Sequence, residues 1–174
     1  MMQNILDPAQ PLLINTRQLE FLPMAVELNE QILEIARGTG AFRDQEIKAL
    51  EEVIDDYFDQ FRELGHVCEV ACLDGETVGF LYFAPNPMSE GAWQLWWIIL
   101  RDDLRGKGLG ARLLHRAEQQ TRENQGRLMF IETSSQEKYG GTLKFYFKHG
   151  YEKEAQLRDF YHEGDDMVIF RKKL

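Results

Sequence analysis

Residues 94–117 decide the fold, and they are Gln-Leu-Trp-Trp-Ile-Ile-Leu-Arg-Asp-Asp-Leu-Arg-Gly-Lys-Gly-Leu-Gly-Ala-Arg-Leu-Leu-His-Arg-Ala. The apolar run Leu95–Leu100 predicts a buried strand, and leucines at positions 109, 113 and 114 recur at the spacing of one helix face. Glycines at positions 106, 108 and 110 form the turn between them. Glycine lets backbone N–H groups converge on an anion, and the first turn of a helix leaves such groups unpaired. The stretch therefore predicts a strand, a phosphate-binding turn and a helix.

Two familiar phosphate-binding turns fit this stretch poorly. A P-loop carries a magnesium-binding Ser or Thr after its lysine, and no such hydroxyl follows Lys107. The dinucleotide pattern G-x-G-x-x-G/A is met by Gly106, Gly108 and Ala111, with Glu132 at about the distance of a ribose-binding acid. However, five residues separate the strand from Gly106, and too few residues follow Glu132 to complete a doubly wound sheet. Dinucleotide binding stays as the weaker alternative.

A third pattern fits in full, and a second motif accompanies it. Residues 105–110, Arg-Gly-Lys-Gly-Leu-Gly, are similar to the Q/R-x-x-G-x-G/A loop of the GNAT family of N-acetyltransferases. Residues 145–151, Phe-Tyr-Phe-Lys-His-Gly-Tyr, resemble the F-Y-x-x-x-G-F/Y segment of the same family. The resemblance implies an α/β fold whose mixed, mostly antiparallel sheet of six to seven strands has helices on both faces. It implies one N-acetyltransferase domain over residues 1–174.

Composition and charge limit the class of protein. No apolar run approaches the ~20 residues that span a bilayer, so we expect no membrane partner. The first residues lack a signal-peptide pattern, which favours a cytoplasmic protein. The net charge of −9 argues against a nucleic-acid partner. Residues 1–90 hold 17 acids and 5 Lys/Arg, whereas residues 91–174 hold 12 and 15. This asymmetry fits either a cationic acceptor opposite an anionic cofactor or a solvated acidic helix face.

The remaining pattern predicts the order of elements. We expect a strand within residues 12–22, a helix from Pro23 to Gly38, and a second helix near residues 47–61. Asp74-Gly75 between two apolar runs predicts a hairpin. A strand over residues 128–132 should run parallel to the strand before the glycine turn. After a helix that ends at Gly150, two strands at 151–158 and 167–171 should be linked by residues 159–166. Cys68 and Cys72 are too far apart along one strand to form a disulfide, and we expect no metal site.

The resemblance implies acetyl-CoA as cosubstrate and names the residues that would hold it. The glycine loop would bind the diphosphate, and an open strand edge would pair with the pantetheine arm. A backbone N–H of Ile99 or its neighbour would receive the thioester oxygen. The predicted cofactor-binding residues are Ile98, Ile99, Leu100, Arg105, Gly106, Lys107, Gly108, Leu109, Gly110 and Ala111.

The resemblance also implies the catalytic groups. Tyr146 would protonate the departing thiolate as general acid, although a core tyrosine is the alternative. Glu132 would act as general base, although a solvent-facing acid at a strand end explains it equally well. Two positions depart from the family. Gln94 replaces an acid that some members carry, and Tyr139 replaces an Asn that contacts the pantetheine arm.

The acceptor implied by the resemblance is a primary amine of a small molecule. Candidate contacts are Phe42, Glu46, Tyr161 and His162, with a packing residue and a first-turn acid as the alternatives for the first two. Transfer should be direct, because both cysteines precede the cofactor motif. The alternative function is a coenzyme-A-binding sensor or scaffold without turnover. The family resemblance further implies a homodimer.

Overall fold

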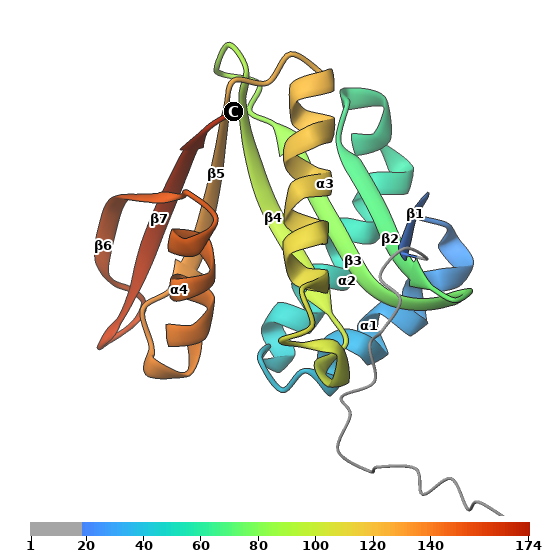
Figure 1. Cartoon of the computed structure of the whole chain (residues 1–174), viewed down its shortest axis with the longest axis horizontal. Coiled ribbons are helices and arrows are strands. Elements are labelled where there is room, and N and C mark those ends of the chain that lie inside the picture. Colours follow the sequence, from blue (N-terminus) through green and yellow to red (C-terminus); the bar gives the residue numbers. More distant parts are fainter. Residues whose placement is uncertain (1–18) are drawn as a thin grey trace, which may run out of the picture.

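The structure is a computed structural model that describes residues 19–174. The described chain forms one mixed sheet with helices on both sides (Figure 1). The strands are β1 Leu19–Pro23, β2 Val67–Leu73, β3 Glu76–Pro85, β4 Ala92–Leu100, β5 Leu128–Ser134, β6 Glu152–His162 and β7 Asp165–Lys173. The α-helices are α1 Asn29–Gly38, α2 Asp44–Asp59, α3 Leu109–Glu123 and α4 Gly140–Lys148.

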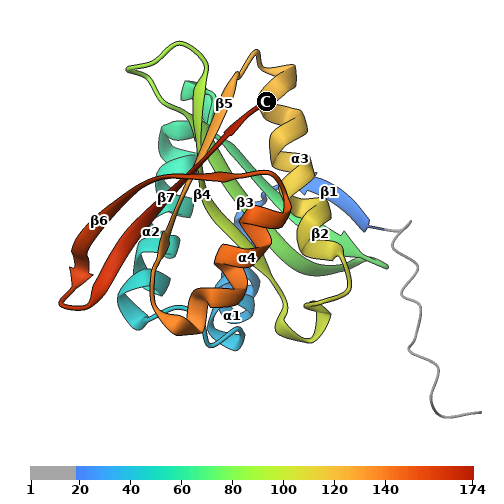
Figure 2. The same cartoon turned by 60° about the vertical axis from the view of Figure 1, so that its left-hand side comes forward.

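The sheet confirms the predicted α/β fold class. Its seven strands lie in the order β1-β2-β3-β4-β5-β7-β6. Neighbours are antiparallel except β4 and β5, which run parallel as predicted, with α3 as the crossover between them. Figure 2 shows α1 and α2 on one face of the sheet and α3 and α4 on the other.

Two apolar clusters hold these layers together. Leu113 and Leu114 of α3 and Tyr146 of α4 pack with inward residues of the sheet on one face. Ile32 of α1 and Leu50 of α2 pack on the other face. Helix α3 therefore buries the leucine face that its sequence predicted, and the sheet is covered on both sides where β2, β3 and β4 lie.

The structure corrects two boundaries. Pro23 is the last residue of β1 and pairs with Glu69, whereas the helix α1 begins only at Asn29, after a short 3₁₀ turn. Residues 159–162 continue β6 instead of forming a long connection, so the hairpin turn is only two residues long. The strand expected within residues 12–22 is β1, and residues 12–18 lie outside the described part.

A buried ion pair joins the two helices of one face to the sheet. Glu118 of α3 has a side chain that is 3% exposed, and its carboxylate accepts a hydrogen bond from Lys172 Nζ of β7 at 2.8 Å. The same ammonium donates to the carbonyl of His149, at the C-terminal end of α4, at 2.8 Å. Lys172 thus fixes α4, which carries Tyr146, against α3.

We predict that Lys172→Met lowers the free energy of unfolding by about 3 kcal/mol, because removing one partner leaves the Glu118 carboxylate buried without its main counter-charge. Urea denaturation measures this. Lys48→Met is the matched control, since it breaks the exposed pair with Glu52 and should cost only about 0.3–0.5 kcal/mol. Equal losses in the two variants would contradict the role given to Lys172.

Candidate active site

The site is built around a split in the sheet between β4 and β5. The two strands pair only over their first halves, and the last pair is Leu95 with Ile131. Beyond it, β4 continues to pair with β3 and β5 with β7, but not with each other. The β3–β4 register shifts at Trp96, which marks a bulge at the start of the split. A bulge bends a strand away from its neighbour, so this one accounts for the open strand edge expected from the sequence.

The backbone of β4 offers polar groups to this split. The amide of Arg101 donates to the carbonyl of Val78 in β3 at 2.8 Å. Because successive residues of a strand point their N–H and C=O groups to opposite sides, Ile99 also faces β3. Ile98 and Leu100 consequently face the split. The prediction named Ile99 or a neighbour as the residue that receives the thioester oxygen. The backbone amides of the neighbours Ile98 and Leu100 are the ones that point toward the split.

The glycine loop lies at the N-terminal end of α3. Gly106 and Gly108 have φ values of +76° and +81°, and a Cβ added to either would meet no atom within 4 Å. Within residues 19–174, no protein group accepts the amide hydrogens of residues 106–111. The first turn of α3 carries no acid. Open backbone and unpaired amides at a helix N-terminus suit the oxygens of a diphosphate.

The cations around this loop are not equivalent. Arg101 is held by Asp103 at 2.7 Å and by Glu76 at 3.3 Å, while Arg105 pairs with Asp102 at 3.1 Å. Lys107 has no carboxylate within 4.0 Å among the described residues. Lys107 is therefore the loop cation that is free to meet a phosphate.

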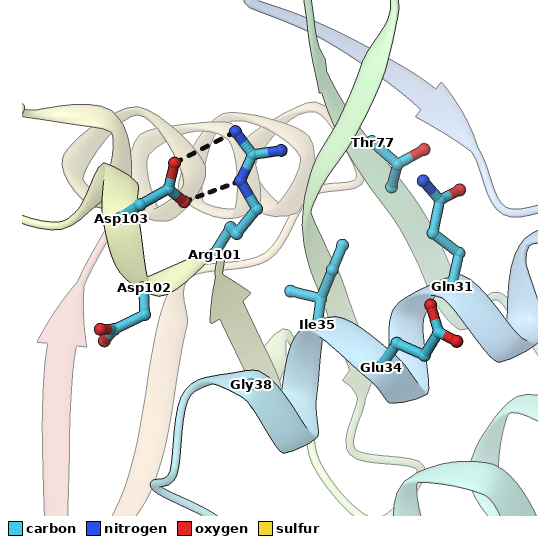
Figure 3. Close-up of a pocket in the computed structure, with 8 residues that line it drawn as sticks. All are labelled: Gln31, Glu34, Ile35, Gly38, Thr77, Arg101, Asp102 and Asp103. Atoms are coloured by element: carbon cyan, nitrogen blue, oxygen red, sulfur yellow. Dashed lines mark hydrogen bonds and ion pairs between the residues drawn. The ribbon is translucent and has the colours of Figure 1, made fainter.

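A surface pocket of ≈380 Å³ lies beside the corner that follows β4. Figure 3 shows the residues that line it. Gln31, Glu34 and Ile35 of α1 lie on one side of it, and the ion pair of Arg101 with Asp103 lies on the other. None of the predicted catalytic, cofactor-binding or acceptor residues lines this pocket. The predicted site residues lie instead in the split and on its two rims.

Tyr146 lies in the apolar cluster that also contains Leu95 and Ile131, the last paired residues before the split. It is 3% exposed, and its ring packs against Tyr151 and Phe170 with centroids 5.7 and 5.5 Å away. Burial raises the pKa of its hydroxyl well above the ordinary value, which keeps the phenol protonated. No group within residues 19–174 forms a hydrogen bond with that hydroxyl.

Glu132 is the first residue of β5 beyond the last pair with β4. Its neighbour Ile131 faces the α3 side, so the carboxylate faces the α1–α2 side of the sheet. Desolvation raises the pKa of the Glu132 carboxyl above its ordinary value. A raised pKa makes a carboxylate a better proton acceptor.

The predicted acceptor residues gather on the same side. Burial, followed by the nearby charges of Glu132, Asp165 and Glu46, raises the pKa of Tyr161 to about 12. These groups from four elements therefore lie close together. Phe42 packs on Trp97 of β4 with ring centroids 5.5 Å apart.

His162 lies at the end of β6, half-exposed, with Nε2 3.4 Å from Asp165 and 2.9 Å from Gln136. It belongs to the rim of this group rather than to its centre.

Sequence reasoning missed two members of the site. Trp97 was predicted only as part of a strand, and its contact with Phe42 depends on how the α1–α2 loop folds back. Asp165 is 3% exposed and accepts a hydrogen bond from Ser134 Oγ at 2.5 Å. No local pattern marks either residue, because both contacts join distant parts of the chain.

Within residues 19–174, no three His, Cys, Asp or Glu side chains form a group that could hold a metal ion.

Both a model of a protein family and solved structures match this chain. The family model described as acetyltransferase (GNAT) family matches residues 27–151. A protein assigned to that family in Desulfovibrio desulfuricans has a solved structure with a TM-score of 0.84 and 30% identity, covering 89% of this chain and 98% of its own. A comparison with curated protein sequences finds no match.

More distant structures share the fold. The PaiA N-acetyltransferase of Thermoplasma acidophilum, solved with coenzyme A, has a TM-score of 0.70 at 20% identity and covers 90% of this chain and 99% of its own. The ribosomal-protein-S18-alanine N-acetyltransferase of Escherichia coli has a TM-score of 0.72 at 13% identity, with coverages of 89% and 93%. No helix within residues 19–174 is both long and apolar enough to cross a membrane. The family model and the structural match together show that the chain belongs to the GNAT family of acetyltransferases.

Proposed function

We propose that the protein transfers the acetyl group of acetyl-CoA directly to a primary amine of a small molecule. The observation that carries this is the split between β4 and β5. One rim presents unpaired amides and Lys107 at the N-terminus of α3, and the other side presents carboxylates. An anionic donor and a cationic acceptor can therefore reach the same opening from different sides.

The donor would be held by backbone groups. We assign the diphosphate to the amides of residues 106–111 and to Lys107, because these have no protein partner within the described chain. The pantetheine arm carries amide groups that can pair with Ile98 and Leu100. Acetyl-CoA supplies the activated thioester, and the protein supplies position and charge.

The chemistry follows from the groups at the split. The amine nitrogen attacks the thioester carbon, and the oxyanion that forms accepts a hydrogen bond from the amide of Ile98 or Leu100. The carbon–sulfur bond then breaks, and Tyr146 gives its proton to the thiolate. Glu132 takes the proton that leaves the amine, directly or through water. Gln94 cannot accept a proton, which leaves Glu132 for this role.

Charge favours a cationic acceptor. Burial is the main cause of the raised pKa of Tyr161, and the charges of Glu46, Glu132 and Asp165 lie near enough to add to it. The guanidinium of Arg43, at the start of α2, is already engaged by Glu46 at 3.2 Å. An alkylammonium would therefore meet net negative charge at this entrance.

The single domain and the cytoplasmic location expected from the sequence stay predictions.

We also propose a homodimer through β6, one of the two edge strands of the described sheet. Leu157 and Phe160 on this strand are 44% and 54% exposed. If two copies of β6 meet antiparallel about Gln156, Glu154 of one copy faces Arg158 of the other. Two bulges interrupt the β6–β7 ladder, so we expect side chains rather than a long backbone ladder to make the contact.

Thiol release from acetyl-CoA should occur with one class among free amines, amino acids, polyamines and short peptides, and Tyr146→Phe should lower kcat by about 10²–10⁴-fold, the range for a lost general acid. Tyr151→Phe is the matched control, because this neighbouring core tyrosine bonds Met129 Sδ and should keep kcat within about threefold.

Equal activity of Tyr146→Phe and Tyr151→Phe would contradict the general-acid role. Saturable binding of acetyl-CoA without turnover on any amine would instead support the alternative, a coenzyme-A-binding module without catalysis. Fluorescence of Trp96 and Trp97 reports that binding, and a response to NADH in place of acetyl-CoA would revive dinucleotide binding.

The second prediction concerns the glycine loop. Gly108→Ala should weaken acetyl-CoA binding by about tenfold or more, because its Cβ enters the space assigned to phosphate and displaces a charge-assisted hydrogen bond. Gly75→Ala is the control, since Gly75 has φ +85° in an equally open turn and carries the same backbone strain. Calorimetric titration measures both, and equal affinities would contradict the assignment.

The third prediction concerns assembly. Wild-type protein should sediment as a dimer, Arg158→Glu as a monomer, and the charge-swapped pair Glu154→Arg with Arg158→Glu again as a dimer. Restoration is expected because the swap recreates opposite charges across the two-fold axis. A wild-type protein that sediments as a monomer would contradict the β6 interface.

A further inference from the structure

Two loops from opposite sides of the split meet on the α1–α2 face of the sheet. One is the loop of residues 39–43 between α1 and α2, and the other is the segment of residues 135–139 after β5. The hydroxyl of Tyr139 donates a hydrogen bond to the carbonyl of Ala41 at 2.6 Å, across 98 residues of sequence. This contact bridges the open end of the split.

The first loop is fixed to the β4 side. Thr39 Oγ1 donates to the carbonyl of Ala36 at 2.7 Å and accepts the amide of Ala41 at 3.2 Å. Phe42, the next residue, rests on Trp97 of β4. Ala41 is therefore held between an internal turn and an aromatic contact, so its carbonyl is a firm attachment point.

The second segment is fixed to the β5–β7 side. Ser134 Oγ bonds Asp165 and accepts the amide of Gln136 at 3.1 Å. Ser135 exchanges two hydrogen bonds with Asp166 of β7, of 2.9 and 3.0 Å. Since each loop is attached to a different half of the divided sheet, the Tyr139–Ala41 bond joins the two halves.

The bridge lies beside the proposed acceptor entrance. Arg43 and Glu46 follow Ala41 at the start of α2, and Tyr139 is near enough to Tyr161 to contribute to its raised pKa. A molecule that reaches Glu132 from this face has to pass next to the bridge. An acceptor with one narrow amine-bearing chain can do so, whereas a polypeptide lying across the face would meet the joined loops.

We propose that Tyr139 is the residue that sets acceptor width, by holding the α1–α2 loop across the split. This rests on the proposed transferase function and deepens it. Tyr139 positions the entrance and takes no part in proton transfer, so its effect is on recognition of the amine rather than on the donor or on the chemical step.

The test is Tyr139→Phe, which removes one hydroxyl and keeps the ring. Hydrogen exchange followed by mass spectrometry should show faster exchange over residues 39–43. The KM for the amine found in the panel should rise about tenfold, as expected for one lost hydrogen bond, and bulkier amines should become relatively better substrates. The KM for acetyl-CoA and kcat should stay unchanged. Tyr57→Phe, the same change in the core under α2, should alter none of these.

Each outcome decides a separate point. Unchanged exchange over residues 39–43 would overturn the bridge. Faster exchange with an equal rise in both KM values, or with a fall in kcat alone, would overturn the role in acceptor width. A wild-type protein that turns over no amine would overturn the proposed function and the width role with it, while exchange would still decide whether the bridge holds the loop.

Discussion

Beyond Leu95 and Ile131, two parallel neighbours in the sheet stop pairing, and the polar backbone of β4 faces an opening instead of a strand. Buried N–H and C=O groups need partners, so a split in the middle of a sheet is costly unless a ligand fills it. Three features around the opening are consistent with a ligand that fills it. The bulge at Trp96 turns β4 away, α3 brings its N-terminus to one rim, and α4 lays Tyr146 near the apex.

The charge asymmetry of the chain is only partly explained by this site. Most acids of α2 lie on its exposed face, while Ile47, Leu50 and Ile54 face the sheet, so they form a solvated helix surface. Glu46, at the start of the helix, is the one acid of α2 that contributes to the potential at Tyr161. The explanation of a solvated helix face therefore holds for most of these acids, while a cationic acceptor stays a prediction. The solvated helix surface accounts for the larger number of acids in α2.

Local patterns were enough to predict the hairpin at Asp74-Gly75, the glycine loop and the parallel β5, because turn chemistry and periodicity act over a few residues. They failed where contacts between residues far apart in the sequence determine the structure. Pro23 continues a strand because β1 is an edge strand, where proline is tolerated. Residues 159–162 stay in β6 because Asp166 Oδ1 accepts the amide of Asp159, which occupies a left-handed conformation at φ +54°. The Tyr139–Ala41 bond and the burial of Asp165 likewise had no local signal.

The surroundings of Tyr146 give the chemistry a physical basis that its motif alone does not. The Tyr146 hydroxyl keeps some access to solvent, because the fully buried side-chain atoms without a partner in residues 19–174 are Asn29 Oδ1 and Thr121 Oγ1. Tyr151, its neighbour in the core, directs its hydroxyl to Met129 Sδ at 3.2 Å, so the cluster can satisfy a phenol where one is only structural. Tyr146 has no such acceptor within residues 19–174. A phenol that has no protein partner within residues 19–174 and still reaches solvent can meet a group of the substrate, and burial keeps it protonated, as the proposed general acid requires.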